Sequence, residues 1–253
     1  MYAPERHQAI LDRARTDGRV EVRDLALSLA VTPETIRRDL TSLEKRGLLR
    51  RAHGGAIPVE RLGIEPEVAA REGHLAGEKD RIATAALAEV PDGGSIAVDA
   101  GTTTVRLAEL LPLDRRLTVV THSLPVAMAL VGRPNIDLHL IGGHLRGVTQ
   151  AAVGPWAAQA LSTVSVDVAF IGTNGLSLER GLTTPDLDEA VVKSAIIASA
   201  RRVVVLADHS KFGRQDFGHV APLSAVDTVI TDADVDDELA DDIESAGPEV
   251  VRA

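Results

Sequence analysis

The first part of the chain owes its predicted fold to VTPETIRRDLTSL, residues 31–43. Thr32 is a favoured N-terminal cap for a helix, and Pro33 suits the first helical position. Three apolar residues then recur at the spacing i, i+4 and i+7, which places them on one helix face. These residues are Ile36, Leu40 and Leu43. The stretch therefore predicts an amphipathic helix, which Gly47 ends.

The flanking residues extend this helix to a small domain. Helices are expected near Glu5–Ala14 and Val22–Leu29, and a short β-wing near Leu48–Ala56, where Gly54 and Gly55 allow a tight turn. The order helix, helix, helix, wing predicts a winged helix-turn-helix domain over residues 1–57. Such a motif places its last helix in the major groove of DNA.

The face of the third helix opposite the apolar stripe is polar and partly basic. Arginine can bind guanine through two hydrogen bonds or bind phosphate, and hydroxyl groups can do either singly. The wing would meet backbone phosphates. The alternative is a helix-turn-helix that serves only as scaffold within an enzyme. The predicted DNA-binding residues are Thr32, Glu34, Thr35, Arg37, Arg38, Thr41, Ser42, Lys45, Arg50, Arg51 and His53.

Charge is divided along the chain. The formal net charge is −10, which argues against a protein that is basic throughout. Residues 1–60 hold 11 Lys and Arg against 9 Asp and Glu, whereas the remainder carries a net charge of −12. A basic patch on an acidic molecule favours a small anion-binding module, although a solvated helix face is the alternative.

Composition excludes several classes of protein. The 253 residues contain no cysteine, which rules out disulfides, a cysteine nucleophile, thiolate zinc sites and iron–sulfur clusters. Aromatic residues are only 2% of the chain, too few for stacking platforms that bind single-stranded nucleic acid. No apolar run is long enough for a membrane span, and the start lacks a signal-peptide core, so a cytoplasmic protein is expected.

Beyond residue 76 the pattern changes to alternating strands and helices. Six short apolar runs read as strands, and they alternate with five helical stretches, which predicts a mostly parallel sheet covered on both faces. The strands are expected at 95–98, 117–120, 137–141, 167–171, 202–206 and 227–230. The helices are expected near 78–90, 103–111, 124–131, 155–161 and 187–200. Residues 58–76 read as a linker.

One strand is followed by DAGTTT, residues 99–104, which opens a helix. The carboxyl ends of parallel strands are where α/β proteins bind ligands, and a helix N-terminus offers free N–H groups to phosphate. The stretch is neither a Walker loop nor a dinucleotide fingerprint. The alternative is simple helix capping by Thr102.

Polar or glycine-rich loops follow four further strands, and a parallel sheet would bring them to one edge. Carboxylates and amides can bind sugar hydroxyls, whereas lysine and arginine can bind phosphate. Together the loops predict a site for a small polyhydroxylated anion, although each one alone reads as an ordinary turn. The predicted effector-binding residues are Asp99, Gly101, Thr102, Thr103, Thr104, His122, Ser123, Gly142, Gly143, Arg146, Gly172, Asn174, Gly175, Asp208 and Lys211.

Three other features receive plainer interpretations. Glu189 and Lys193, four residues apart on a predicted helix, are interpreted as a surface ion pair, with a role in the site as the alternative. The histidines show no metal-ligand spacing, so no metal site and no cofactor are expected. The acidic segment 232–244 reads as a solvated helix face.

Several motifs in order resemble the DeoR/GlpR family of bacterial sugar-metabolism regulators, over nearly the whole chain. They are VTPETIRRDL (31–40), LRRAHGGA (49–56), DAGTTT (99–104), LIGG (140–143), DVAFIG (167–172), GLTT (181–184) and DHSKFG (208–213). The resemblance implies a winged helix-turn-helix joined to a sugar-phosphate-binding domain similar to ribose-5-phosphate isomerase. It also implies an effector site lined by Asp99, Gly101, Thr102, Thr103, Thr104, Asn174, Asp208 and Lys211.

The sequence departs from the family at His122, where asparagine is usual, and this puts the reading of a sugar hydroxyl there in doubt. The neighbourhood of Met1-Tyr2-Ala3 is similar to fructose-operon regulators, which would favour fructose 1-phosphate as ligand.

The resulting hypothesis is a repressor of a sugar catabolic operon, acting as a homodimer or homotetramer on double-stranded operator DNA. A phosphorylated sugar, bound by residues 77–253, would release it. A sugar-phosphate isomerase that uses Asp99 or Asp208 as general base is the rival hypothesis. A DNA-binding architectural protein without an effector is a third.

Overall fold

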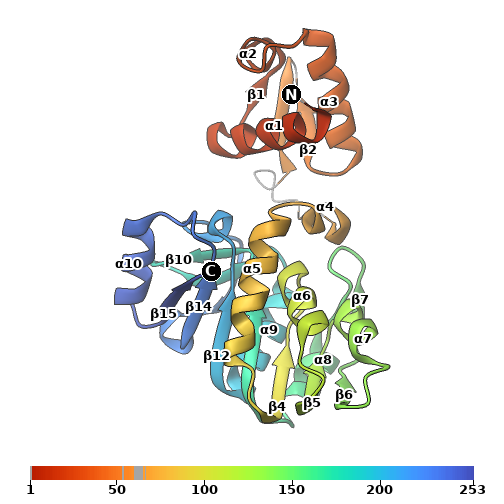
Figure 1. Cartoon of the computed structure of the whole chain (residues 1–253), viewed down its shortest axis with the longest axis vertical. Coiled ribbons are helices and arrows are strands. Elements are labelled where there is room, and N and C mark those ends of the chain that lie inside the picture. Colours follow the sequence, from red (N-terminus) through yellow and green to blue (C-terminus); the bar gives the residue numbers. More distant parts are fainter. Residues whose placement is uncertain (1, 53, 60–64, 66) are drawn as a thin grey trace. The chain divides into compact units, whose positions relative to one another are not determined.

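The computed structural model describes residues 2–52, 54–59, 65 and 67–253. It divides into two compact units, Met1–Arg71 and Glu72–Ala253, which are described one at a time (Figure 1). The division falls within segment 58–76, the predicted linker. The predicted domain bounds, 1–57 and 77–253, stay predictions.

The first unit contains the predicted helices and wing. Its elements are α1 (Ala3–Asp17), β1 (Val20–Glu21), α2 (Val22–Ser28), α3 (Pro33–Lys45), β2 (Leu49–Ala52), β3 (Gly55–Pro58) and α4 (Val68–Glu72), the last of which ends at the first residue of the second unit. The α3 helix begins as predicted, because Thr32 Oγ1 accepts a hydrogen bond of 3.2 Å from Thr35 N. Its stripe of Ile36, Leu40 and Leu43 is fully buried.

The wing has a third strand that the sequence analysis missed. The two residues of β1 pair antiparallel with β3, so that Val20 faces Ala56 and Glu21 faces Gly55. A Cβ atom at Gly55 would lie 1.8 Å from Val20 O, so only glycine permits this approach. Gly55 therefore closes the three-stranded sheet as well as following the turn at Gly54, where φ is +80°.

The second unit is built on a parallel sheet. Its strands are β4 (Gly93–Val98), β5 (Arg116–Thr121), β6 (Ile136–Leu140), β9 (Val166–Gly172), β12 (Ala200–Leu206), β14 (Thr228–Thr231) and β15 (Glu249–Arg252). They lie in the order β15-β14-β12-β9-β4-β5-β6, and each neighbouring pair is parallel. The six predicted strands are confirmed, whereas β15 was not foreseen.

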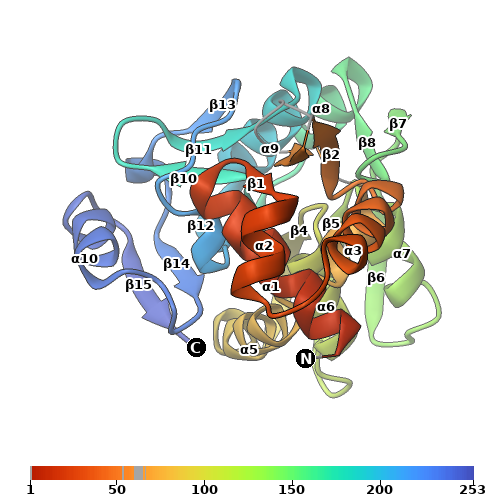
Figure 2. The same ribbon diagram turned by 90° about the horizontal axis from the view of Figure 1, so that it is seen from above.

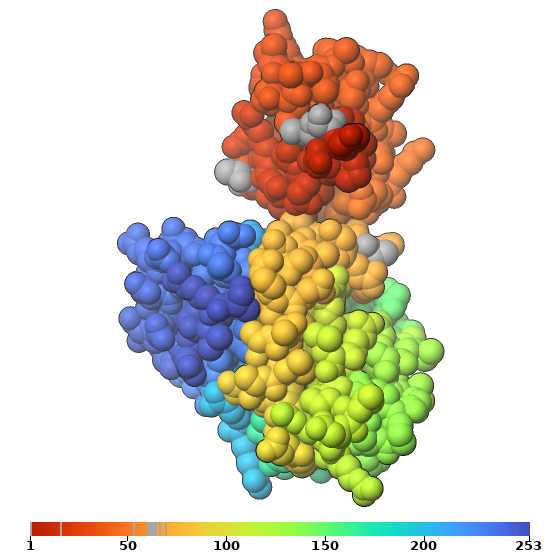
Figure 3. All heavy atoms as spheres, in the orientation of Figure 1, coloured from red at the N-terminus to blue at the C-terminus, as the bar shows by residue number. Residues whose placement is uncertain are grey.

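Helices cover both faces of this sheet. They are α5 (Ala76–Ala86), α6 (Thr102–Leu110), α7 (Leu124–Leu130), α8 (Pro155–Leu161), α9 (Leu187–Ser199) and α10 (Asp237–Ser245). Figure 2 shows α5, α6 and α7 on one side of the strands and α8 and α9 on the other. In the space-filling view of Figure 3, the gold α5 lies beside the blue C-terminal segments, in accord with its contacts to β14.

Alternate residues of each strand serve the two layers, because successive side chains of a strand point to opposite faces. Phe170 packs in the cluster that includes Ile82 and Leu107, from α5 and α6. Its neighbour Ile171 packs in the cluster of Leu161 and Ile196, from α8 and α9. Both faces are therefore apolar, which is why the strands read as nearly continuous apolar runs.

Two smaller β-structures complete the second unit, and neither was predicted. A hairpin joins β7 (His144–Arg146) to β8 (Ala151–Val153). A three-stranded antiparallel sheet holds β10 (Gly175–Ser177), β11 (Gly181–Thr184) and β13 (Gly218–Ala221). Within the described ranges, no helix has both the length and the apolar character that crossing a bilayer requires.

The sheet has a topological switch point between β4 and β9. These strands are neighbours, but from β4 the chain proceeds to β5 and β6 on one side, and from β9 it proceeds to β12 and β14 on the other. The loops after β4 and β9 therefore leave in opposite directions. In open α/β sheets, ligands bind at the carboxyl ends of the strands at such a point.

Candidate functional site

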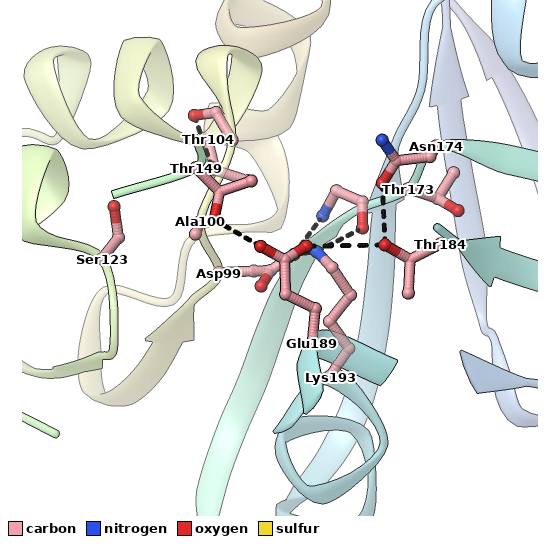
Figure 4. Close-up of polar contacts among 12 residues, drawn as sticks. Asp99, Ala100, Thr104, Ser123, Thr149, Thr173, Asn174, Thr184, Glu189 and Lys193 are labelled. Atoms are coloured by element: carbon pink, nitrogen blue, oxygen red, sulfur yellow. Dashed lines mark hydrogen bonds and ion pairs between the residues drawn. The ribbon is translucent and has the colours of Figure 1, made fainter. Parts of the chain in front are cut away.

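Asp99 lies at the switch point, immediately after β4, and it is fully buried. Its backbone N donates to Phe170 O at 3.0 Å, and its Oδ2 accepts from Gly172 N at 2.9 Å. Asp99 therefore joins the ends of the two central strands. Figure 4 shows its carboxylate beside Lys193 of α9.

Two basic side chains face this carboxylate. Lys193 Nζ donates to Asp99 Oδ2 and also, at 3.0 Å, to Gly172 O. His122 Nε2 lies 2.9 Å from Asp99 Oδ1. Burial by itself would raise the pKa of Asp99, but the charge of Lys193 and the hydrogen bond of His122 outweigh it and lower this pKa to about 2. Asp99 is therefore ionised at neutral pH.

His122 holds Asp99 in position. Its Nδ1 donates to Ala152 O at 2.9 Å, and only 1% of the residue is exposed. Both ring nitrogens thus lie within hydrogen-bond distance of protein atoms. The sequence analysis doubted that His122 binds a sugar hydroxyl, because asparagine is usual at this position. The contacts of His122 agree with that doubt, since the ring orients Asp99.

The loop after Asp99 opens α6. Gly101 occupies the N-cap position, Thr102 is the first helical residue, and Thr104 Oγ1 donates to Gly101 O at 2.9 Å. The alternative of capping by Thr102 alone is therefore wrong, since Thr102 lies inside the helix. The N–H groups of a first helical turn have no partner within the helix, so this turn can accept an anion.

The interpretation of Glu189 and Lys193 as a surface ion pair is wrong. Each residue is only 3% exposed, and both side chains extend from α9 toward the strand ends (Figure 4). Glu189 Oε1 accepts from Arg146 Nη1 at 3.2 Å and from Thr149 Oγ1, whereas Lys193 pairs with Asp99. The i, i+4 spacing was read correctly as one helix face, but that face is buried.

Asn174 lies on the other side of this cluster, after β9. Its Oδ1 accepts from Thr184 Oγ1 at 3.1 Å, and the same hydroxyl lies 3.5 Å from Glu189 Oε2. Three strand-end segments thus converge on α9: the loop after β4, the loop after β9, and β11. Such a set of amide, hydroxyl and carboxylate groups suits a ligand rich in hydroxyls.

Asp208 follows β12 and is 1% exposed. It caps a short 3₁₀ helix, His209–Lys211, by accepting from Ser210 N at 3.2 Å. Burial raises the pKa of Asp208, but the charge of Lys211, the Ser210 hydrogen bond and the charges of Lys79 and His74 together lower it to about 2. Lys79 and His74 were missed in the sequence, because they lie 129 or more positions away, at the start of α5 and just before it.

Other predicted effector residues have structural tasks. Ser123 is buried and caps α7 by accepting from Val126 N at 3.4 Å. Arg146, expected to bind phosphate, makes ion pairs with Asp186 at 3.1 Å and Glu189 at 3.2 Å, so its charge already faces two carboxylates.

The predicted glycines differ in surroundings. Gly142 and Gly143 are exposed, whereas Gly175 is buried. A Cβ at Gly143 would lie 2.7 Å from Val153 O, and one at Gly175 would lie 2.5 Å from Arg214 O. Close packing of backbones explains these two glycines without a ligand.

A group that the histidine spacing did not reveal lies in the segments after β12 and β14. His209, Asp232 and Asp234 each place one potential metal-ligand atom within 4.8 Å of the others. The carboxylate of Asp232 already accepts from His209 N at 2.8 Å and Asp234 N at 3.1 Å and lies 2.8 Å from His209 Nδ1. Asp232 is fully buried, so the interpretation of segment 232–244 as wholly solvated is wrong at this residue. The absence of a metal site stays a prediction.

In the first unit, the predicted face of α3 is accessible. Glu34, Arg37, Arg38, Thr41 and Lys45 are exposed, whereas Thr35 and Ser42 are half-buried. The Arg38 side chain is 82% exposed and lies 3.9 Å from Glu34, and Arg37 donates to Glu34 at 3.2 Å. Because exposed ion pairs contribute little free energy, these side chains can change conformation to bind a polyanion at small energetic cost.

The two described arginines of the wing behave differently. Arg50 is exposed, but Arg51 folds back onto α3, where its Nη1 donates to Arg37 O at 3.3 Å and to Thr41 Oγ1 at 3.4 Å. Arg51 therefore braces the wing against α3. His53, the third predicted wing residue, lies outside the described residues.

A buried ion pair joins α1 to α3, and the sequence analysis missed it. Arg6 Nε donates to Asp39 Oδ2 at 2.6 Å, and His7 Nε2 lies 3.0 Å from Asp39 Oδ1. Burial acts to raise the pKa of Asp39, but the hydrogen bonds of Arg6 and His7 lower it overall. The pair fixes α1 to the side of α3 away from its exposed face.

Comparison with known proteins accounts for both units. Residues 6–61 match the family described as DeoR-like helix-turn-helix domain, and residues 75–233 match the DeoR C terminal sensor domain. The HTH-type transcriptional regulator GlpR of Haloferax volcanii is 41% identical over 99% of this chain and 98% of its own. The glycerol-3-phosphate regulon repressor of Escherichia coli is 33% identical over 92% of both chains.

A further relative and a solved structure complete the comparison. The uncharacterized HTH-type transcriptional regulator FruR of Bacillus subtilis is 36% identical over 92% of this chain and 93% of its own. The ribose 5-phosphate isomerase A of Methanocaldococcus jannaschii aligns with 53% of this chain and 52% of its own, at 20% identity and a TM-score of 0.39.

Proposed function

Since the chain belongs to the DeoR family of helix-turn-helix transcriptional regulators, we propose that it represses a sugar catabolic operon and leaves its operator when a phosphorylated sugar binds the second unit. Its close relatives carry the names of regulators and repressors, and the chain is a DNA-binding regulator rather than an enzyme.

One observation carries this proposal: an ionised, fully buried Asp99 at the switch point of the sheet, next to the free N-terminus of α6. The helix end offers amides to a phosphate group. Asn174 offers an amide to hydroxyls, and the buried Asp99 carboxylate holds Lys193 and the Gly172 N–H in place. A phosphorylated sugar carries both kinds of group.

The proposed effector contacts follow from this geometry. Phosphate would lie on the amides and hydroxyls of Gly101 to Thr104, with Lys211 as a cation, and sugar hydroxyls would face Asp99, Asn174 and Asp208. His122 and Arg146 would act indirectly, since His122 already engages Asp99 and Ala152 O, and Arg146 already pairs with two carboxylates.

The proposed DNA contacts use the exposed face of α3 and the wing. Arg37, Arg38 and Lys45 are exposed cations on one helix, and Arg50 adds another from β2. Two copies of the chain would place two such helices on the two half-sites of an operator, which favours a homodimer or homotetramer. A regulator that binds DNA in this way would act in the cytoplasm.

The rival enzyme hypothesis meets a physical objection. A general base works best with a pKa near the operating pH. The pKa values of Asp99 and Asp208 are each lowered to about 2, well below neutral pH, which disfavours either carboxylate as the general base.

An operator titration tests the proposal. A duplex selected by the protein from a random-sequence pool serves as DNA, and fructose 1-phosphate and glycerol 3-phosphate are the first two effectors tried. We expect one sugar phosphate to weaken DNA binding, and the unphosphorylated sugar to leave it unchanged.

Lys211→Ala separates the two roles. It should weaken effector binding, because a half-exposed cation beside Asp208 is lost, and should leave DNA binding without effector unaltered. Unchanged DNA affinity across a broad panel of sugar phosphates would contradict the proposed switch, and turnover of any bound sugar phosphate would favour the enzyme.

A further inference from the structure

Arg106 joins the candidate effector site to the start of the second unit. It lies on α6, one turn after Thr102, and its guanidinium donates three hydrogen bonds in three directions. Nη1 donates to Thr102 O at 2.9 Å, Nε to Asp80 Oδ1 at 2.7 Å, and Nη2 to Glu72 O at 3.1 Å. The planar guanidinium fixes the relative positions of these acceptors.

The acceptors belong to segments with different tasks. Thr102 opens the helix turn on which the proposed phosphate would lie. Glu72 is the last residue of α4, the helix through which the chain arrives from the first unit. Asp80 lies on α5. One side chain therefore connects the first turn of α6 to the end of α4.

A second cation lies in the same segment. Lys79 is 3% exposed, its Nζ donates to His74 O at 2.7 Å, and its charge lowers the pKa of Asp208. Between these residues, Leu75 adopts a φ of +50°, a left-handed conformation unfavourable for leucine. Such a position is retained only where its surroundings enforce it.

We propose that Arg106 is a positioning residue that transmits effector occupancy from the loop after β4 to segment 72–80, and thereby to the helix that leads to the DNA-binding unit. This inference rests on the proposed function. A phosphate on the first turn of α6 would shift Thr102 O, and Arg106 would carry the shift to Glu72 and Asp80.

The test compares Arg106→Ala with a matched control in the full-length protein. The control is Arg133→Ala, because Arg133 also donates to backbone carbonyls of α6 and of the residue that ends it, namely Ala108 O at 3.1 Å and Leu111 O, but near the helix's opposite end. Arg106→Lys is a second variant in case the alanine form folds poorly. It keeps the positive charge but loses the planar guanidinium that donates to several acceptors at once.

Three quantities are measured for each protein: operator affinity, affinity for the active sugar phosphate by calorimetry, and operator affinity at saturating sugar phosphate. The coupling ratio is the operator affinity without sugar phosphate divided by the operator affinity at saturating sugar phosphate. In the parent protein this ratio should be at least ~5. We expect Arg106→Ala to bring this ratio to within twofold of one while sugar affinity stays within threefold of the parent. Arg106→Lys should give an intermediate ratio, and Arg133→Ala should keep the parent ratio.

The outcomes separate the two proposals. A parent protein that binds no sugar phosphate would contradict the proposed function and the transmission with it. If the parent responds to the sugar, only the variants decide: a full coupling ratio in Arg106→Ala overturns the transmission by Arg106. A loss of sugar affinity in proportion to the loss of coupling also overturns it, because Arg106 would then form part of the binding site itself.

Discussion

The two units use charge in opposite ways. On α3 the cations are exposed, as the 82% exposure of the Arg38 side chain illustrates, and their partners are weak surface contacts. In the second unit, Asp99, Lys193 and Glu189 are almost wholly buried and bonded in fixed positions.

The difference follows from the ligands proposed for each unit. DNA presents many phosphates along a long surface, so exposed and adaptable cations gain affinity by releasing counterions. A small anion offers few contacts, and its site must be organised before it arrives. Asp39 is the exception in the first unit, because it is buried with Arg6 and His7 and sets the position of a helix.

The largest effect is expected from Lys193→Met, which leaves Asp99 buried without its cation. Removing one partner of a buried ion pair costs about 3–5 kcal/mol. Hydrogen exchange of the β4 and β9 amides under native conditions should show this loss in the second unit. Lys45→Met, which removes an exposed cation from α3, should change stability by less than about 0.5 kcal/mol.

The double variant Asp99→Asn with Lys193→Met sharpens this test, because it removes both charges. It should be more stable than Lys193→Met alone. An ordinary substitution changes the free energy of unfolding by about 1 kcal/mol. If Lys193→Met changed it by no more than this, the proposed difference between the two units would be wrong.

Acid should weaken the second unit through its buried carboxylates. The pKa values of Asp99 and Asp208 lie at about 2 in the folded chain, below the ordinary value of 3.8. Their stabilisation is therefore complete above about pH 5 and is lost progressively as the pH falls through 3.8 and then through 2. Urea denaturation at pH 7, 4 and 3 measures it.

Asp208→Asn is the variant for this pH series, because Lys211, the cation with the largest effect on Asp208, is half-exposed and can be solvated. The variant should lose less stability than the parent between pH 4 and 3, whereas Asp114→Asn, at an exposed carboxyl, should follow the parent. Parallel curves for Asp208→Asn and the parent would mean that Asp208 contributes no such stabilisation.

The residues of α3 show how much of the fold could be read locally. Thr32, Pro33 and the apolar stripe act within one helix, so the sequence predicted its start and its buried face. The two residues of β1 could not be recognised, because their strand exists only through pairing with β3, about 35 positions later.

The candidate site divides along the same line. The polar strand ends, including Asp99 and Asp208, were predictable, because parallel strands end at one edge. Which face of α9 is buried was not, so Glu189 and Lys193 were misread. Lys79 and Arg106 were missed because their roles depend on contacts between distant segments.

Arg38→Ala tests the exposed side of the comparison. Losing one base contact should weaken operator binding by about 1–3 kcal/mol, and losing a phosphate contact should lower the salt slope by about one. Fluorescence anisotropy at several salt concentrations measures both, and Arg116→Ala, at an exposed arginine of β5, is the control. Sugar binding should be unaltered, and an unaffected operator affinity would remove Arg38 from the interface.

The smallest effect is expected from Thr32→Ala, which removes the cap of α3. Thr32 Oγ1 accepts from Thr35 N at 3.2 Å, and losing such a cap costs about 1 kcal/mol. Hydrogen exchange of the Thr35 and Ile36 amides should rise accordingly. Thr32→Ser, which retains the oxygen, should restore the parent rate. Because the cap is exposed, a loss above about 2 kcal/mol would exceed what capping supplies and would show that the first unit also depends on an organised polar contact.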